Sequence, residues 1–194
     1  MKVIGLTGGI GSGKTTLLRW FEKQGIPCFE SDAVGKQLLN SDLKEHIISH
    51  FGEQYILPSG QVDTKKLGAL VFNNEEALKQ LNAIVHPAVK IEFEKFKKQH
   101  KKSILIVKEA AILFESGGDV DCNAVIYVSA SEEARIQRVM QRDQVSKEAV
   151  IKRMQHQWSD QKKRELADYI IENEYINEAY QQAEKIKTSL KKSN

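Results

Sequence analysis

The feature that most constrains this chain is a glycine-rich loop, Gly8–Thr15. Its sequence, GGIGSGKT, matches G-x-x-x-x-G-K-[ST] at every fixed position. The β-branched and apolar run before it, Lys2–Leu6, predicts a buried strand, and residues 14–24 after it predict a helix. A glycine-rich turn that only links a strand to a helix is the alternative. The strand–loop–helix context favours a phosphate-binding loop, called the P-loop below.

The residue types of the P-loop suit a nucleoside triphosphate held with Mg²⁺. Glycines let the backbone approach phosphate oxygens closely, and the N–H groups at the helix start attract anions. Lys14 is expected to act on the β- and γ-phosphates during catalysis, and the Thr15 hydroxyl is expected to bind Mg²⁺. The residues predicted to bind ATP are Gly9, Gly11, Ser12, Gly13, Lys14, Thr15 and Thr16.

Composition narrows the class of protein. A chain of 194 residues with a 41% hydrophobic fraction can build one sizeable core with a small inserted subdomain. A net charge of +3 is too mild for a protein that coats nucleic acid, so no nucleic-acid partner is expected. No apolar run approaches about 20 residues, and the apolar start is short for a signal peptide. The two cysteines suggest a reducing compartment, and we expect a cytoplasmic protein without a membrane partner. The oligomeric state is not predicted.

Strand and helix patterns alternate along the chain. Short apolar runs predict further strands at 26–29, 103–107, 124–128 and 169–171, and amphipathic patterns predict helices at 132–143, from Ser146 to about 158, and at the C-terminus. Between Ala33 and Lys102 the helical period dominates, and Pro87 is expected to kink or break a helix there. Asp63 is a predicted N-cap of a helix within this segment, and Ser146 is a predicted N-cap of the helix that runs to about 158. These patterns predict an α/β fold with a parallel sheet covered on both faces and a helical insertion.

Missing motifs restrict the reaction. The chain has no N-K-x-D motif, which reads guanine in GTPases, and this argues against a GTPase. Residues 57–61 match a transporter-ATPase signature only loosely, and long basic tracts suited to a nucleic-acid motor are absent. A small-molecule kinase remains, with a nucleotide-binding switch protein as an alternative from another class.

Several residues are candidates for the acceptor side. Asp32 follows the second strand and is equally suited to be a catalytic base or a helix N-cap. Glu109 follows the strand that begins at Ser103, at the edge where ligands bind, and Glu115 is either a cleft residue or a solvated acid. His86 alone reads as a structural histidine.

Two arginines are candidates for the phosphate side. Arg138 and Arg142 are four residues apart and share a helix face. A mobile basic lid that clamps the phosphoryl group is one interpretation. The residues alone favour the other, an ordinary charged helix face.

Taken together, these segments resemble the dephospho-CoA kinase family over nearly the whole chain. The T-G-G-I-G-S-G-K form of the P-loop and the L-N-x-x-x-H-P segment are its most specific parts. The matching pieces are Ile4–Thr15, Asp32-Ala33, Leu81–Pro87, Leu113-Phe114-Glu115, Arg138, Gln141-Arg142-Asp143, Gln157, and Ala167-Asp168 leading to Asn173.

The resemblance implies that ATP phosphorylates the ribose 3′-hydroxyl of dephospho-CoA, giving coenzyme A and ADP in the final step of coenzyme A biosynthesis. Another P-loop kinase acting on a nucleoside or nucleotide is the alternative. The family architecture implies a nucleotide-binding core (1–32, 103–141 and 164–194), a helical substrate domain (33–102) and a lid (142–163).

The resemblance also assigns roles. Asp32 is the expected base, Arg142 is expected to meet the phosphates, and His86 and Glu109 are expected at the substrate. Two departures from the family pattern stand out: Glu30 replaces the first acid of D-x-D, and Glu109 replaces the aspartate of D-x-P-L-L-F-E, whose proline is also missing. No role is predicted for Glu30.

Overall fold

The computed structural model describes residues 1–71 and 73–192, which divide into two compact units. The first unit is formed by Met1–Phe29 and the chain from His100 on, and the second by Glu30–Gln99. The sequence pattern placed the helical insertion at 33–102. The assignment of a substrate domain and a lid stays a prediction.

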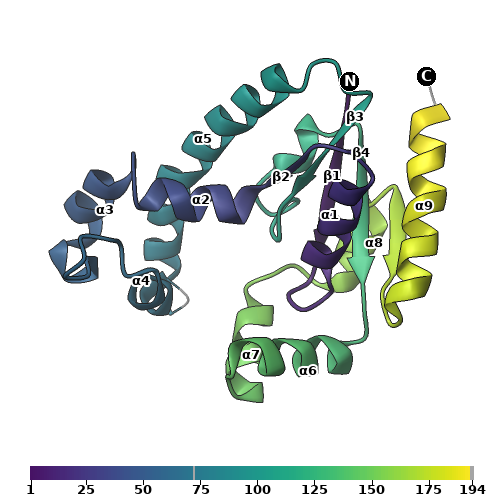
Figure 1. The fold of residues 1–194 in the computed structure, drawn as a ribbon. Coiled ribbons are helices and arrows are strands. Elements are labelled where there is room, and N and C mark those ends of the chain that lie inside the picture. The colour runs from purple at the N-terminus through teal and green to yellow at the C-terminus, as the bar shows by residue number, and fades with distance from the viewer. Residues whose placement is uncertain (72, 193–194) are drawn as a thin grey trace. The chain divides into compact units, whose positions relative to one another are not determined.

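The first unit is built on a five-stranded parallel sheet in the order β2-β3-β1-β4-β5 (Figure 1). On the central strand β1, Leu6 lies opposite Glu109 of β3 and Ile126 of β4. The predicted parallel sheet is therefore confirmed. The strands are β1 (Lys2–Gly8), β2 (Cys28–Glu30), β3 (Leu105–Glu109), β4 (Ala124–Ser129) and β5 (Tyr169–Glu172).

Local capping signals fix several helices of this unit. The serines at 131, 146 and 159 each precede a helix and accept a hydrogen bond from the backbone N–H three residues on, at 3.3–3.4 Å. Gly25, just after α1, has a φ of 73°, which suits glycine at a helix end. The helices are α1 (Lys14–Lys23), α6 (Glu132–Asp143), α7 (Lys147–Gln155), α8 (Asp160–Leu166) and α9 (Ile176–Lys192), with a 3₁₀ turn at Gly118–Asp121.

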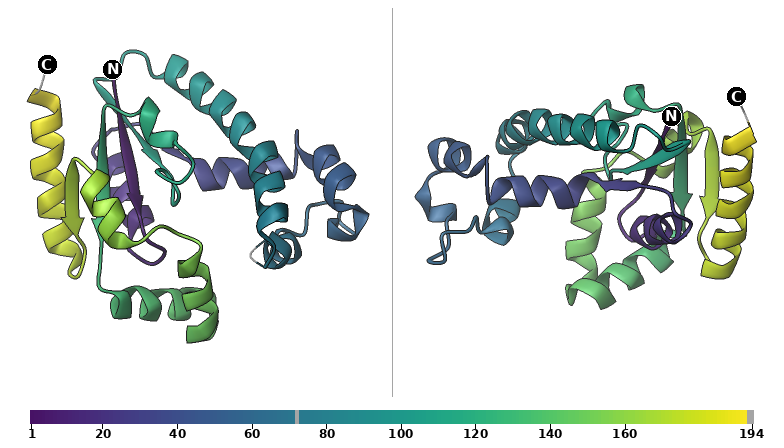
Figure 2. Two further views of the ribbon diagram at one scale, coloured as in Figure 1. Left: turned by 180° about the vertical axis from the view of Figure 1, so that it is seen from behind. Right: turned by 45° about the horizontal axis from the view of Figure 1, so that its top comes forward.

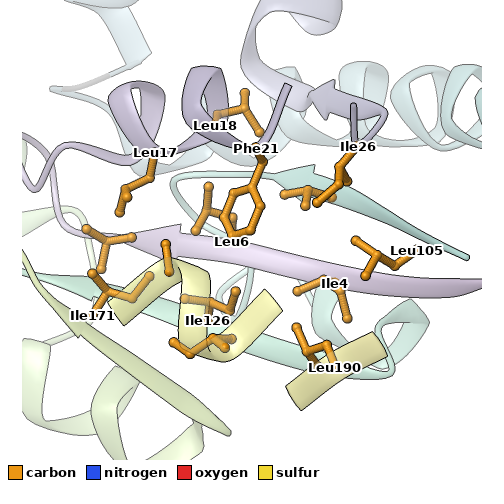
Figure 3. Close-up of a cluster of buried hydrophobic side chains, with 14 of the residues drawn as sticks. Ile4, Leu6, Leu17, Leu18, Phe21, Ile26, Leu105, Ile126, Ile171 and Leu190 are labelled. Carbon is orange, nitrogen blue, oxygen red and sulfur yellow. The ribbon is translucent and has the colours of Figure 1, made fainter. Parts of the chain in front are cut away.

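The core of this unit lies on both faces of the sheet. On one face the buried side chains of α1 and α9 pack against alternate residues of the strands, among them Ile4, Leu6 and Ile126 (Figure 3). Figure 2 shows α9 running alongside the sheet in both of its views. On the other face Val125 packs with Leu113, and the Tyr127 hydroxyl reaches α8. The unit thus has three layers, with the sheet in the middle.

The second unit is helical. Its buried core contains Ile47, Phe51, Leu67 and Val71, with partly buried residues of α5 around them. Asp63 accepts the Lys66 N–H at 2.9 Å, which confirms the predicted cap of the helix that follows. The elements are α2 (Ser31–Leu39), α3 (Lys44–Phe51), a 3₁₀ turn at Glu53–Tyr55, α4 (Thr64–Val71) and α5 (Glu75–Gln99).

A kink or a break was predicted at Pro87; the break is wrong, and the kink stays a prediction. The helix α5 continues through Pro87 for 25 residues. A proline removes one hydrogen bond from a helix, but tertiary packing can compensate. Such packing is seen between α2 and α5. A Cβ built on Gly35 of α2 would lie 3.3 Å from Val85 and 3.6 Å from Val89 of α5, so the two helices approach closely.

Both cysteines of the first unit are free and half-buried. Burial raises the pKa of the Cys28 thiol to about 12 and that of the Cys122 thiol to about 11. The Cys28 Sγ lies 3.4 Å from the carbonyl oxygen of Ile26. Among the described helices, none has the length and apolar character needed to cross a bilayer.

Candidate active site

The P-loop lies where β1 ends and α1 begins. Gly11 and Gly13 have φ values of 79° and 96°, which turn the backbone toward the helix. Gly13 occupies the N-cap position of α1, where no side chain caps the helix, and the first turn carries no acidic residue. No acidic side chain of this turn therefore competes for its N–H groups, and the helix dipole favours an anion there.

The Lys14 side chain lies folded over the P-loop. It is 8% exposed, and its Nζ donates to the carbonyl oxygens of Gly8 at 2.9 Å and Gly9 at 3.2 Å. The Ser12 N–H also donates to the Gly9 oxygen, at 3.1 Å. The loop thus places an ammonium group beside the amides at the start of α1, as a triphosphate requires.

Arg135 and Asn173 form the outer wall of the P-loop. A Cβ on Gly9 would collide with the Arg135 guanidinium, and one on Gly13 would collide with the Asn173 amide. The Asn173 Nδ2 donates to the Ser12 carbonyl oxygen at 2.7 Å. These close approaches explain why glycine stands at both positions.

An ion pair between the buried Arg135 and the partly exposed Asp160 holds Arg135 in place. Its guanidinium lies 2.5 Å from Asp160 at the start of α8, and the Tyr127 hydroxyl donates to the other oxygen of Asp160 at 2.5 Å. Burial and the negative charge of Asp160 raise the pKa of Tyr127. Sequence patterns did not predict this network, because an arginine on an amphipathic helix gives no sign of being buried.

Residues 157–163, called the lid root here, are attached to the core by polar contacts. Lys163 is fully buried and lies 2.7 Å from Glu115. The Glu115 carboxylate also accepts the Trp158 N–H at 3.0 Å, while Gln157 bonds to the backbone of the P-loop and of Ala111. Glu115 is thus half of a buried ion pair, and the interpretation as a solvated acid is wrong.

The two arginines on α6 have different surroundings. Arg138 donates to the backbone oxygens of Asn173 at 2.8 Å and Glu174 at 3.2 Å, so it joins α6 to the end of β5. Arg142 is exposed and forms two hydrogen bonds to Asp143, which also meets Arg153 at 2.8 Å. The hydrogen bonds from Arg142 lower the pKa of Asp143, so this acid stays ionised. The role of Arg142 at the phosphates stays a prediction.

Glu109 and Thr15 lie at the same edge of the sheet in the first unit. Glu109 ends β3 and is 3% exposed, whereas the side chains of Thr15 and Thr16 are exposed on the first turn of α1. Within the described residues, no group of three or more His, Cys, Asp or Glu residues could hold a metal. The role of Thr15 as a Mg²⁺ ligand stays a prediction, and a single hydroxyl oxygen would suit a cation that keeps water and phosphate oxygens as its other ligands.

In the second unit, Asp32 and His86 are electrostatically coupled. Asp32 is exposed in the first turn of α2, and the N-cap position of that helix is Glu30, so the N-cap interpretation of Asp32 is wrong. Burial lowers the pKa of His86, and the charge of Asp32 opposes this shift. A cavity of about 460 Å³ lies nearby on α5 and α3, lined by Leu43, His46, His50, Gln80, Ala83, Ile84 and Pro87.

The comparison with known families shows to which family the chain belongs. The sequence profile of the family described as "Dephospho-CoA kinase" matches residues 2–178. The chain belongs to the dephospho-CoA kinase family. A member from Fusobacterium nucleatum is 37% identical over 172 residues, which cover 88% of this chain and 89% of that protein.

Solved structures agree with this family and with a P-loop kinase fold. A crystal structure from Thermus thermophilus has a TM-score of 0.86 at 31% identity and covers 97% of this chain and 96% of that one. A dephospho-CoA kinase from Campylobacter jejuni has a TM-score of 0.71 at 28% identity, with 99% and 98% coverage. The expected kinase and its α/β fold are thus confirmed.

Proposed function

We propose that this chain transfers the γ-phosphoryl group of ATP to the ribose 3′-hydroxyl of dephospho-CoA, giving coenzyme A and ADP. The observation that carries the proposal is the family match over residues 2–178, which includes a P-loop with an uncapped, acid-free helix start and a buried lysine. We expect this reaction in the cytoplasm, where ATP is available.

The P-loop binds the triphosphate in this proposal. The N–H groups of Gly11, Gly13 and the first turn of α1 surround the phosphate oxygens. The Lys14 ammonium keeps its bond to the Gly9 carbonyl oxygen and turns its other N–H donors to the β- and γ-phosphates. The Thr15 hydroxyl would hold Mg²⁺, which would neutralise phosphate charge. The support for these roles is the geometry of the loop and the exposure of Thr15.

Asp32 receives the proton of the acceptor hydroxyl in this proposal. Its side chain is exposed in the first turn of α2, so a substrate can reach it. His86 is coupled to Asp32 and would favour its ionised form when protonated. Glu109 is the second acid assigned to the substrate, on the basis of its place at the end of β3.

Residues 142–163 act as the lid, and Arg142 neutralises charge on the transferred group. Arg142 is available for this because its partner Asp143 retains Arg153 when Arg142 leaves. Closure over the P-loop would exclude water and limit hydrolysis of ATP.

A coupled ADP-release assay tests the proposal with dephospho-CoA and, separately, with a panel of nucleosides and nucleotides. We expect turnover that depends on dephospho-CoA and Mg²⁺. Faster turnover with a nucleoside or nucleotide would identify a different kinase, and ATP binding without any turnover would identify a switch protein.

The variant Asp32→Asn tests the base. It keeps the size of the side chain but removes its basicity, so we expect turnover to fall by about 10²–10⁴-fold while ATP binding stays unchanged. Near-normal turnover would remove Asp32 from the base role.

A further inference from the structure

One side chain, Gln157 of the lid root, joins two loops of the first unit that are distant in sequence. Its Oε1 accepts the backbone N–H of Ile10 in the P-loop at 2.9 Å. Its Nε2 donates to the carbonyl oxygen of Ala111, after β3, at 3.1 Å. A primary amide carries one acceptor and one donor group, and here each serves a different loop.

The Ile10 N–H belongs to the same peptide group as the Gly9 carbonyl. A trans peptide is planar, and its N–H and C=O point in opposite directions. The Gly9 oxygen accepts the Lys14 Nζ at 3.2 Å and the Ser12 N–H at 3.1 Å. Gln157 therefore holds one end of a rigid group whose other end holds the ammonium that the P-loop presents to phosphate.

This peptide group needs such a restraint. It lies between Gly8 and Gly11, in a stretch where three of four residues are glycines with broad backbone freedom. The Ile10 side chain packs against a cluster from α6 and α7 that includes Ile136, Val139 and Val150. That packing holds the side chain, but the direction of the N–H is set by the bond to Gln157.

We infer that Gln157 is a positioning residue for phosphoryl transfer, acting on Lys14 through the Gly9–Ile10 peptide group. Because the Ala111 carbonyl oxygen holds the other end of the same amide, Gln157 is oriented toward the P-loop without nucleotide. The inference rests on the proposed function only in taking a triphosphate as the ligand of the P-loop. It does not depend on the identity of the acceptor.

The variant Gln157→Met tests the inference, because methionine has similar length but no amide. The probes are inorganic tripolyphosphate, ATP and adenosine, each titrated by calorimetry without any acceptor. We expect about tenfold weaker binding of tripolyphosphate and ATP, as for the loss of one net hydrogen bond in the binding-competent loop. Adenosine lacks phosphates, so its affinity should not change.

The matched control is Gln137→Met, on the exposed face of α6, where the Gln137 Nε2 donates to Glu133 at 3.5 Å. It should leave all three affinities within about twofold. A structural defect would weaken adenosine together with tripolyphosphate, and unchanged tripolyphosphate affinity in Gln157→Met would mean that the loop needs no such anchor. Either result overturns the inference.

Two further readouts keep the test independent of folding and of the acceptor. In the unaltered protein without nucleotide, the Ile10 amide should exchange slowly with deuterium in NMR spectra; exchange as fast as in an open loop would refute the bond. If dephospho-CoA proves to be the wrong acceptor, the tripolyphosphate result still stands. If it is the right one, kcat/KM for ATP should fall while KM for dephospho-CoA stays unchanged.

Discussion

Replacing Gly13 by alanine tests how tightly the P-loop is fixed by its neighbours. Gly13 has a φ of 96°, where an L-residue is strained, and an added Cβ would collide with the Asn173 amide. That amide donates to the Ser12 carbonyl oxygen at 2.7 Å, and Asn173 is only 4% exposed. The substitution therefore strains the backbone and displaces a buried hydrogen-bond donor together.

The two effects have separable sizes. Left-handed backbone costs about 1–2 kcal/mol for a residue with a Cβ. A buried carbonyl that loses its partner costs about 1–3 kcal/mol more. We therefore expect Gly13→Ala to lower the free energy of unfolding by roughly 2–5 kcal/mol.

Urea unfolding followed by tryptophan fluorescence measures this change. The chain has two tryptophans, Trp20 and Trp158, and both belong to the first unit, so the signal reports the unit that holds the P-loop. Gly25→Ala is the matched control: Gly25 has a φ of 73°, but nothing lies within 4 Å of its added Cβ. It should show the backbone cost alone, about 1–2 kcal/mol.

The difference in unfolding free energy between the two variants tests whether the Asn173 amide fixes the P-loop. If Gly13→Ala costs no more than Gly25→Ala, the Asn173 amide moves aside freely and does not fix the loop. If both cost nothing, the positive φ values are not retained in solution.

Two other changes have defined outcomes. Lys163→Met removes the ion-pair partner of Glu115 at a site where Lys163 is 0% exposed, so we expect the free energy of unfolding to fall by about 3–5 kcal/mol. The double variant Lys163→Met with Glu115→Leu should recover much of this loss in the same urea assay. His86 has a pKa below 6.5 in the folded chain, so the unfolded chain takes up the proton more readily and stability should fall as the pH drops through 6.5. Thermal unfolding followed by circular dichroism should show a shallower pH dependence for His86→Gln than for the surface variant His156→Gln; equal slopes would contradict the shift.

The sequence predicted the elements that carry strong local signals. The P-loop was predicted because its motif fixes residue types at set positions. Ser146 and Asp63 were predicted as caps because capping depends on neighbouring residues alone. The helix α8 was not predicted, since its seven residues, DQKKREL, carry almost no apolar pattern. Its position is fixed by tertiary contacts.

The candidate site shows the same limit. Lys14 and Thr15 were assigned by motif, but the burial of Lys163 was not predicted. Lysine is rarely buried without a partner, and the partner of Lys163, Glu115, is far away in the sequence. Gln157 was noted only as a matching position of the family. No periodicity indicates that one amide will join the P-loop to the segment after β3.

The raised pKa values of the two thiols have a practical consequence for chemical labelling. With pKa values of about 12 and 11, Cys28 and Cys122 exist almost entirely as thiols near neutral pH, and the thiolate is the form that reacts with maleimides and peroxides. A new cysteine on an exposed position would react far faster than either native one. Fluorophores or spin labels can therefore be attached to one chosen site while both natural sulfurs stay in place.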